Sequence, residues 1–139
     1  MKGGRRVLIV VDVQNDFCPG GALQIKDGDS IIPLINGIME RFDLVVATQD
    51  WHPKNQVSFA SNNPGKNIYD QINISGIAQG LATDYCVYYS AMDSLRYGFR
   101  CNVIIDATRG VDLPKGSIGA VVSEMKDKGI SVISSDDIL

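Results

Sequence analysis

The stretch Val-Leu-Ile-Val-Val-Asp, residues 7–12, is a short apolar run that ends abruptly in a carboxylate. Its apolar residues are mostly β-branched and do not alternate with polar ones. This pattern is typical of a strand buried on both faces of a parallel sheet. Similar runs ending in polar or acidic residues recur at 44–50, 103–106 and 130–134.

Helical patterns separate these runs. Residues 30–42 place Ile, Leu and Met side chains on one stripe, and residues 87–97 and 117–128 behave in the same way. Gly129 follows the last pattern, in the position where helices stop. The alternation of strands and helices predicts an α/β fold, a doubly wound parallel sheet with helices on both faces.

Ligands of such a sheet bind beyond the carboxyl ends of its strands. Asp12 and Asp50 each follow a predicted strand, and a glycine-containing turn over residues 80–86 precedes the predicted helix 87–97. We therefore expect Asp12, Asp50 and this turn to share the functional edge of the sheet.

The composition limits the class of protein. A chain of 139 residues suffices for one domain, and we expect a single domain over residues 1–139. The net charge of −3 argues against a nucleic-acid surface, and no apolar stretch reaches membrane-spanning length. The 3 cysteines, without disulfide-like spacing, indicate free thiols in a reducing compartment, which predicts a cytoplasmic protein.

Cys86 is the candidate nucleophile. It lies in the octet Gly-Leu-Ala-Thr-Asp-Tyr-Cys-Val, residues 80–87, directly before a helix-compatible segment. Backbone N–H groups at a helix start lower the pKa of a cysteine thiol and can receive a developing oxyanion. A thiolate so placed suits acyl transfer. The alternative is a buried structural cysteine.

Two acidic positions offer partners for this chemistry. Asp12 could take the thiol proton and return it to a leaving amine, or it could cap the following loop. Asp50 and His52, two positions apart on extended backbone, can point the same way. Together they suit a borderline divalent cation, although a structural Asp–His pair is the alternative.

These motifs together resemble the nicotinamidase branch of the isochorismatase-like cysteine hydrolases. The matching strings are VVDVQNDFCPGGAL at 10–23, ATQDWHP with SFA within 47–60, GLATDYCV at 80–87 and IIDATRGV at 104–111. The resemblance implies hydrolysis of nicotinamide to nicotinate and ammonia, a step of NAD salvage, through a cysteine acyl-enzyme.

The resemblance also implies roles for individual residues. Cys86 would be the nucleophile and Asp12 its base, and the backbone N–H groups of Ala82 and Cys86 would form the oxyanion hole. Asp50 and His52 would hold one divalent metal ion that orients the pyridine nitrogen. The resemblance favours Zn²⁺ as this ion, with Fe²⁺ or Mn²⁺ as alternatives. The residues implied to line the nicotinamide ring pocket are Phe17, Leu23 and Tyr85.

The chain departs from this family between Gln79 and Gly80. The lysine of the family triad and a second metal histidine, in a Trp-Pro-x-His-Cys motif, belong to a block of about 60–80 residues that is absent here, the size of two strand–helix units. We favour an intact protein that holds this block over a true deletion, because natural sequences agree across local and global levels. A true deletion product is expected to be unstable and inactive.

Two alternatives to a nicotinamidase remain open. One is another amide hydrolase of the same superfamily, acting for example on a carbamoyl or ureido substrate. The other is a catalytically inactive binding protein, because the family lysine and second metal histidine are missing. In each case the partner is a small molecule, and the oligomeric state, including a homo-oligomer, stays open.

Overall fold

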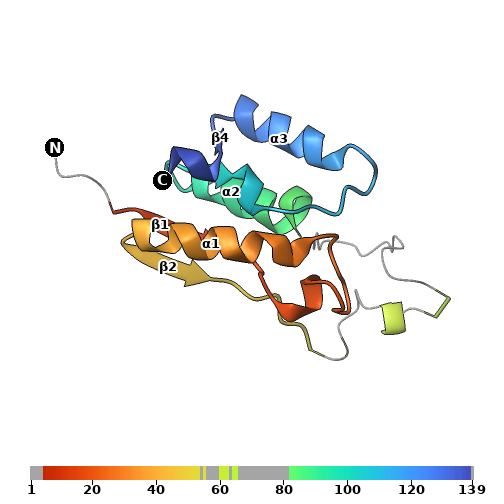
Figure 1. Cartoon of the computed structure of the whole chain (residues 1–139). Helices are drawn as coiled ribbons and strands as arrows, with labels where there is room; N and C mark the ends of the chain where they lie inside the picture. The colour runs from red at the N-terminus through yellow and green to blue at the C-terminus, as the bar shows by residue number, and fades with distance from the viewer. Residues whose placement is uncertain (1–4, 54, 56–59, 63, 66–81, 139) are drawn as a thin grey trace. The chain divides into compact units, whose positions relative to one another are not determined.

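The computed structural model describes residues 5–53, 55, 60–62, 64–65 and 82–138. The chain divides into two compact units, one of residues 1–49 with 80–139 and one of residues 50–79. The first unit holds the helices and strands that carry the α/β fold (Figure 1). The expectation of one domain over the whole chain stays a prediction, and the junction between Gln79 and Gly80 lies outside the described residues.

Strand β1 (Val7–Val10) pairs in parallel with β2 (Leu44–Ala47), with Val7 opposite Leu44 and Val10 opposite Ala47. Helix α1 (Ile32–Ile38) lies between them in sequence and carries a proline in its first turn, where the missing N–H costs nothing. Its Ile38 is only 1% exposed. The predicted strand–helix–strand unit is therefore confirmed, with short 3-10 turns extending α1 at both ends.

The second strand pair is also parallel. Strand β3 (Asn102–Ile104) pairs with β4 (Ser131–Ile133) through the crossover helix α3 (Ser117–Asp127). Helix α2 (Tyr88–Arg96) packs against α3, as Figure 1 shows. Gly129 has φ of +93°, a left-handed conformation that glycine adopts without strain, which confirms the predicted helix stop.

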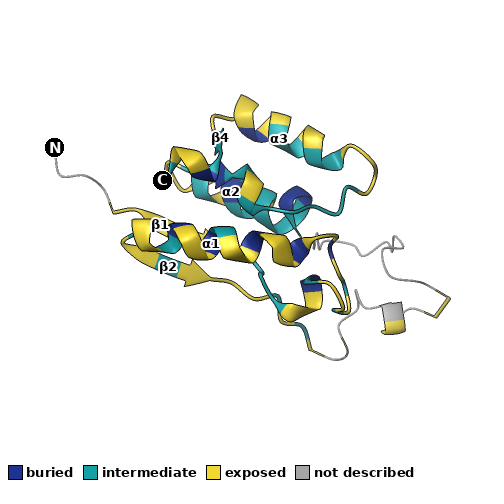
Figure 2. Cartoon of the chain, in the orientation of Figure 1, coloured by how far each residue is buried: buried dark blue, intermediate teal, exposed yellow. Residues whose placement is uncertain are grey.

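The β3–β4 half has its own core. Met125 of α3 is fully buried and packs with Ala91 of α2, Val103 of β3 and Ile130 before β4 (Figure 2). Burial of such side chains contributes about 1.5–3 kcal/mol each. This cluster explains why the pattern of the apolar runs alone was enough to predict these elements.

The two strand pairs remain separate sheets of two strands each. Within the part of the chain that the structure describes, no strand joins β1 to β3. A cavity of about 1120 Å³ is lined by residues that include those of β1 and β3. Within the described residues β1 and β3 each pair with a neighbour on one side only, and both contribute to the lining of this cavity.

None of the helices in the described ranges combines the length and the apolar character needed to cross a membrane.

Candidate active site

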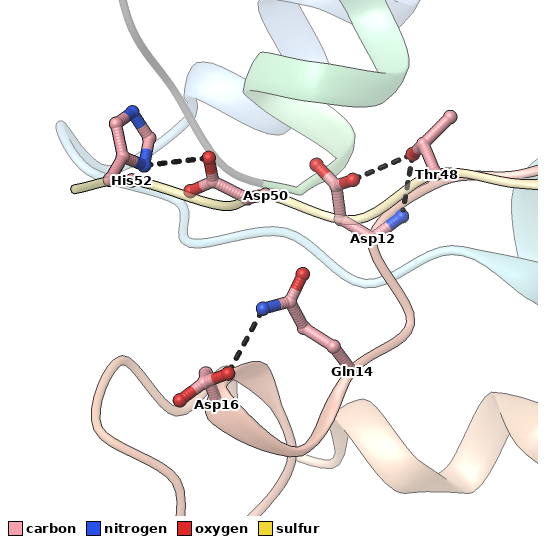
Figure 3. Close-up of polar contacts among 6 residues, drawn as sticks. All are labelled: Asp12, Gln14, Asp16, Thr48, Asp50 and His52. Carbon is pink, nitrogen blue, oxygen red and sulfur yellow. Dashed lines mark hydrogen bonds and ion pairs between the residues drawn. The ribbon is translucent and has the colours of Figure 1, made fainter.

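Asp12 is tied to the end of the neighbouring strand by a reciprocal pair of hydrogen bonds (Figure 3). Its backbone N–H donates to Thr48 Oγ1 at 3.1 Å, and the Thr48 hydroxyl donates to Asp12 Oδ1 at 2.6 Å. Asp12 has φ of +51°, a left-handed conformation that aspartate tolerates better than most residues. Thr48, which the sequence reasoning missed, thus holds the carboxylate at the carboxyl end of β1.

Cys86 lies within a helical turn, not before one. Residues 82–87, here called the cysteine turn, contain a π-helical segment, Thr83–Val87, in which Val87 N donates to Ala82 O at 3.0 Å. Helix α2 continues from it without a break. The α-helix itself, α2, begins at Tyr88, which agrees with the predicted helix over residues 87–97. The π turn that holds Cys86 was not predicted. Such π turns often mark functional sites.

Asp84 is a buried residue of the cysteine turn to which the sequence reasoning assigned no role. Only 6% exposed, it accepts hydrogen bonds from Val111 N, Asp112 N and the Ser117 hydroxyl. A carboxylate can be buried only where donors replace the lost water. The available signal was a charged residue in a turn that otherwise reads as apolar.

Several predicted site residues meet at the cavity lined by β1 and β3. Asp12, Phe17 and Ala82 all contribute to its lining, although they come from distant parts of the sequence. Phe17 is 6% exposed, so its ring is largely enclosed. Asp12 and Ala82 of the cysteine turn thus line one cavity, and the predicted roles of these residues stay predictions.

Other predicted residues lie elsewhere. Leu23, Tyr85 and Cys86, which the structure does describe, are partly buried and are not among the residues that line this cavity. The Tyr85 hydroxyl donates to Leu113 O at 3.0 Å. Burial raises the pKa of Tyr85, and the charge of nearby Asp84 adds to the effect. The assigned roles of these three residues stay predictions.

Cys101 provides a contrast to Cys86. It packs against the core cluster of α2, α3 and β3, and this burial raises the pKa of its thiol. A raised pKa leaves less thiolate at neutral pH, so Cys101 is a poor nucleophile. All 3 cysteines are thiols without a disulfide. Of Cys86 and Cys101, the alternative of a structural cysteine therefore fits Cys101.

Asp50 and His52 belong to the other compact unit. His52 Nδ1 lies 2.8 Å from Asp50 Oδ1, so the two side chains do point toward each other (Figure 3). A carboxylate and an imidazole are suitable donors for zinc, which usually takes four ligands. Within the described ranges, no group of three or more His, Cys, Asp or Glu residues could hold a metal ion. The pair can therefore supply two ligands of a site, and any others must come from water or from elsewhere.

The chain is similar in sequence and structure to several known proteins. No family model matches the chain. Over 80 residues it is 52% identical to the nicotinamidase of Acinetobacter baylyi, a match that covers 58% of this chain and 37% of that relative. Over 204 residues it is 28% identical to the nicotinamidase of Escherichia coli, covering 95% of this chain and 96% of the relative.

Among solved structures, the Acinetobacter baumanii nicotinamidase–pyrazinamidase is 30% identical and superposes with a TM-score of 0.89, covering 100% of both chains. The chain belongs to the nicotinamidase family. The pyrazinamidase of Pyrococcus horikoshii, in complex with zinc, is 29% identical with a TM-score of 0.74 and covers 94% of this chain and 99% of that one. PnC1 from L. infantum, in complex with nicotinate, is 25% identical with the same TM-score and covers 96% and 94%.

This nicotinamidase-family chain is shorter than its relatives through an internal gap. The 204 positions aligned with the Escherichia coli protein include 95% of this chain, so about 70 positions have no residue of this chain opposite them, enough for two strand–helix units. The predicted loss of an internal block is thereby supported. The fold of isochorismatase-like hydrolases is likewise confirmed, since one from Alkaliphilus metalliredigens superposes with a TM-score of 0.68 at 19% identity.

Proposed function

We propose that this chain hydrolyses nicotinamide to nicotinate and ammonia. The observation that carries the proposal is the strained turn from Ala82 to Val87 that holds Cys86 directly before α2, together with the Asp12 carboxylate that Thr48 fixes at the end of β1. Nicotinamidases match this chain in both a short and a long alignment. These relatives do not favour the alternative of a carbamoyl or ureido hydrolase or that of an inactive binding protein. The complex of PnC1 with nicotinate supports the same choice of substrate.

The reaction needs one nucleophile and one proton carrier. The Cys86 thiol gives its proton to Asp12, and the sulfur attacks the carboxamide carbon. The C–N bond then breaks, and Asp12 returns the proton to the departing nitrogen, which leaves as ammonia. Water hydrolyses the thioester with Asp12 again as base, so nicotinate is released and the thiol is restored. Thr48 keeps the Asp12 carboxylate oriented during these proton transfers.

The developing negative charge requires donors near the carbonyl oxygen. The backbone N–H groups of Ala82 and Cys86 are proposed for this oxyanion hole, where one such donor contributes about 3 kcal/mol of transition-state stabilisation. Ala82 has φ of +77° and ψ of −167°, values that a residue with a Cβ rarely adopts. Strain of this kind is often stored where a backbone group is aimed at a substrate.

Phe17, Leu23 and Tyr85 are proposed to contact the pyridine ring, and NAD salvage in the cytoplasm is the proposed setting. The resident metal is proposed to be Zn²⁺, since the Pyrococcus horikoshii relative binds zinc and Asp50 with His52 can supply two ligands. When bound, the ion would polarise and orient a donor atom of the substrate.

Asp50→Ala is expected to weaken zinc binding by at least about 10-fold, because it removes one of the two ligands proposed among the described residues. The measurement is competition with a coloured chelator, which needs no turnover. Asp29→Ala, at an exposed position in the other compact unit, changes the charge equally and serves as the control. Equal zinc affinity in the two variants would contradict the assignment of Asp50 as a ligand.

The proposed function is tested by incubating the chain with nicotinamide at neutral pH and quantifying nicotinate and ammonia. We expect both products in equal amounts from a protein that holds the missing block, and a rate lower by at least about 10²-fold from a true deletion product, because the family lysine is then missing. Absence of both products, with Cys86 labelled no faster than free cysteine by a thiol reagent, would refute the hydrolase and leave the binding protein.

A further inference from the structure

Asp84 joins two segments that are far apart in sequence. Its Oδ1 accepts a hydrogen bond from Val111 N at 3.0 Å, and its Oδ2 accepts from Asp112 N at 3.0 Å and from the Ser117 hydroxyl at 2.6 Å. These donors belong to residues 109–117, here called the anchor loop. Since hydrogen bonds to a carboxylate are stronger than those between neutral groups, Asp84 is a strong link between the cysteine turn and this loop.

Two further bonds connect the same segments on either side of Asp84. Thr83, which is 1% exposed, donates its backbone N–H to Arg109 O at 3.0 Å. Tyr85 donates its hydroxyl to Leu113 O, also at 3.0 Å. Consecutive residues of the cysteine turn, immediately before Cys86, are therefore attached to the anchor loop.

The anchor loop is itself ordered. Asp112 Oδ1 accepts from Gly116 N at 2.8 Å and from Ile118 N at 3.4 Å, which bridges the loop to the first turn of α3. At Gly110 the loop comes so close that an added Cβ would lie 2.9 Å from Asp84 Oδ1 and 2.5 Å from the Ile118 side chain. The loop thus offers Asp84 a fixed set of donors on a rigid base.

The cysteine turn needs such support. Ala82 is held in a strained backbone conformation that persists only where surrounding contacts impose it. The π-helical turn that follows is likewise rare outside constrained sites. The residues attached to the anchor loop lie between Ala82 and Cys86, so they can hold both features in place.

We propose that Asp84 is a positioning residue for Cys86, which fixes the cysteine turn against the anchor loop and thereby sets the direction and environment of the thiol. The consequence for catalysis rests on the proposed function. The anchoring itself does not, because it concerns only the geometry of the turn.

The test uses Asp84→Asn in a chain that carries Cys18→Ser and Cys101→Ala, so that only Cys86 can react. The amide group replaces one acceptor oxygen by a donor, which then faces another donor. We expect the rate of Cys86 alkylation by iodoacetamide at neutral pH to change by at least about 10-fold and its pH profile to shift, because the turn that carries the thiol is no longer held. Asp93→Asn, at an exposed position on α2, removes the same charge and should leave the profile unchanged.

Variants of the anchor loop separate positioning from charge. Ser117→Ala removes the hydrogen bond of 2.6 Å and should shift the profile in the same direction as Asp84→Asn, whereas Ser117→Thr keeps the hydroxyl and should restore it. Gly110→Ala leaves Asp84 chemically intact and should also shift the profile, since the new Cβ pushes the loop away. If Asp84→Asn fails to fold by circular dichroism, Ser117→Ala compared with Ser117→Thr decides.

Amide hydrogen exchange distinguishes failure of this inference from failure of the proposed function. Loss of the anchor should speed exchange of the amides of residues 83–87 by at least about 10-fold while the amides of α3 stay protected. A starting chain whose Cys86 reacts like free cysteine refutes the hydrolase, but faster exchange in Asp84→Asn would still support the anchor. Unchanged alkylation and unchanged exchange in a folded Asp84→Asn would overturn the inference.

Discussion

Replacing Cys86 by alanine is expected to reduce turnover of nicotinamide by at least about 10⁴-fold, because the atom that forms the acyl intermediate is removed. Binding of nicotinate should change little, since the ring contacts are assigned to other side chains. Turnover is measured by release of ammonia, and binding by calorimetric titration with nicotinate.

Cys101→Ala is the matched control for this variant. Cys101 packs against the core, where burial raises the pKa of its thiol, so its removal should leave the rate per folded molecule unchanged. Any loss of stability from the smaller core side chain would appear as a lower folded fraction. If Cys86→Ala kept the rate and Cys101→Ala lost it, the nucleophile would be misassigned.

The strands and helices were predictable because their signals are local. The apolar run beginning at Val7 and the apolar stripe of α1 can each be recognised from their own residues, whatever element they pack against. The glycine at 129 likewise marks a helix end through its own backbone freedom. Asp50 and His52, two positions apart on extended backbone, were expected to point the same way, and they do contact each other.

Features set by tertiary contacts were not predictable. Thr48 meets Asp12 only because β1 and β2 are neighbours with a particular register. Asp84 finds its donors in a loop more than twenty residues further along the chain. The π-helical turn around Cys86 was not predicted either, although α2 begins where residues 87–97 predict a helix. Sequence patterns carry hydrophobicity and backbone propensity, and they do not carry such pairings.

The gap in the sheet has a thermodynamic consequence. In the described part of the chain, β1 pairs with β2 and β3 with β4, while residues of β1 and β3 line the cavity of about 1120 Å³. Strand edges that lose water without gaining partners cost about 1–3 kcal/mol for each buried N–H or C=O group. The total free energy of unfolding of a domain is only about 5–15 kcal/mol. A single absent strand can therefore remove most of the stability.

Inserting the block of about 70 residues that the Escherichia coli relative holds, between Gln79 and Gly80, is expected to raise the kcat for nicotinamide by about 10²–10⁴-fold. The block restores a strand between β1 and β3 and supplies the family lysine. The same chimera should bind less of the dye ANS, because the apolar lining of the cavity is covered. Ammonia release and dye fluorescence are the measurements.

A flexible Gly/Ser insert of equal length is the matched control for this chimera. It lengthens the connection equally but has neither the apolar run needed for a buried strand nor a lysine. A third chain, with the relative's block but with its lysine replaced by methionine, separates the two contributions. Dye binding should fall as in the full chimera, because the strand is present, while the gain in kcat should be lost. If the Gly/Ser insert raised kcat or lowered dye binding as much as the relative's block, the separation of β1 from β3 would not be the defect that limits this chain.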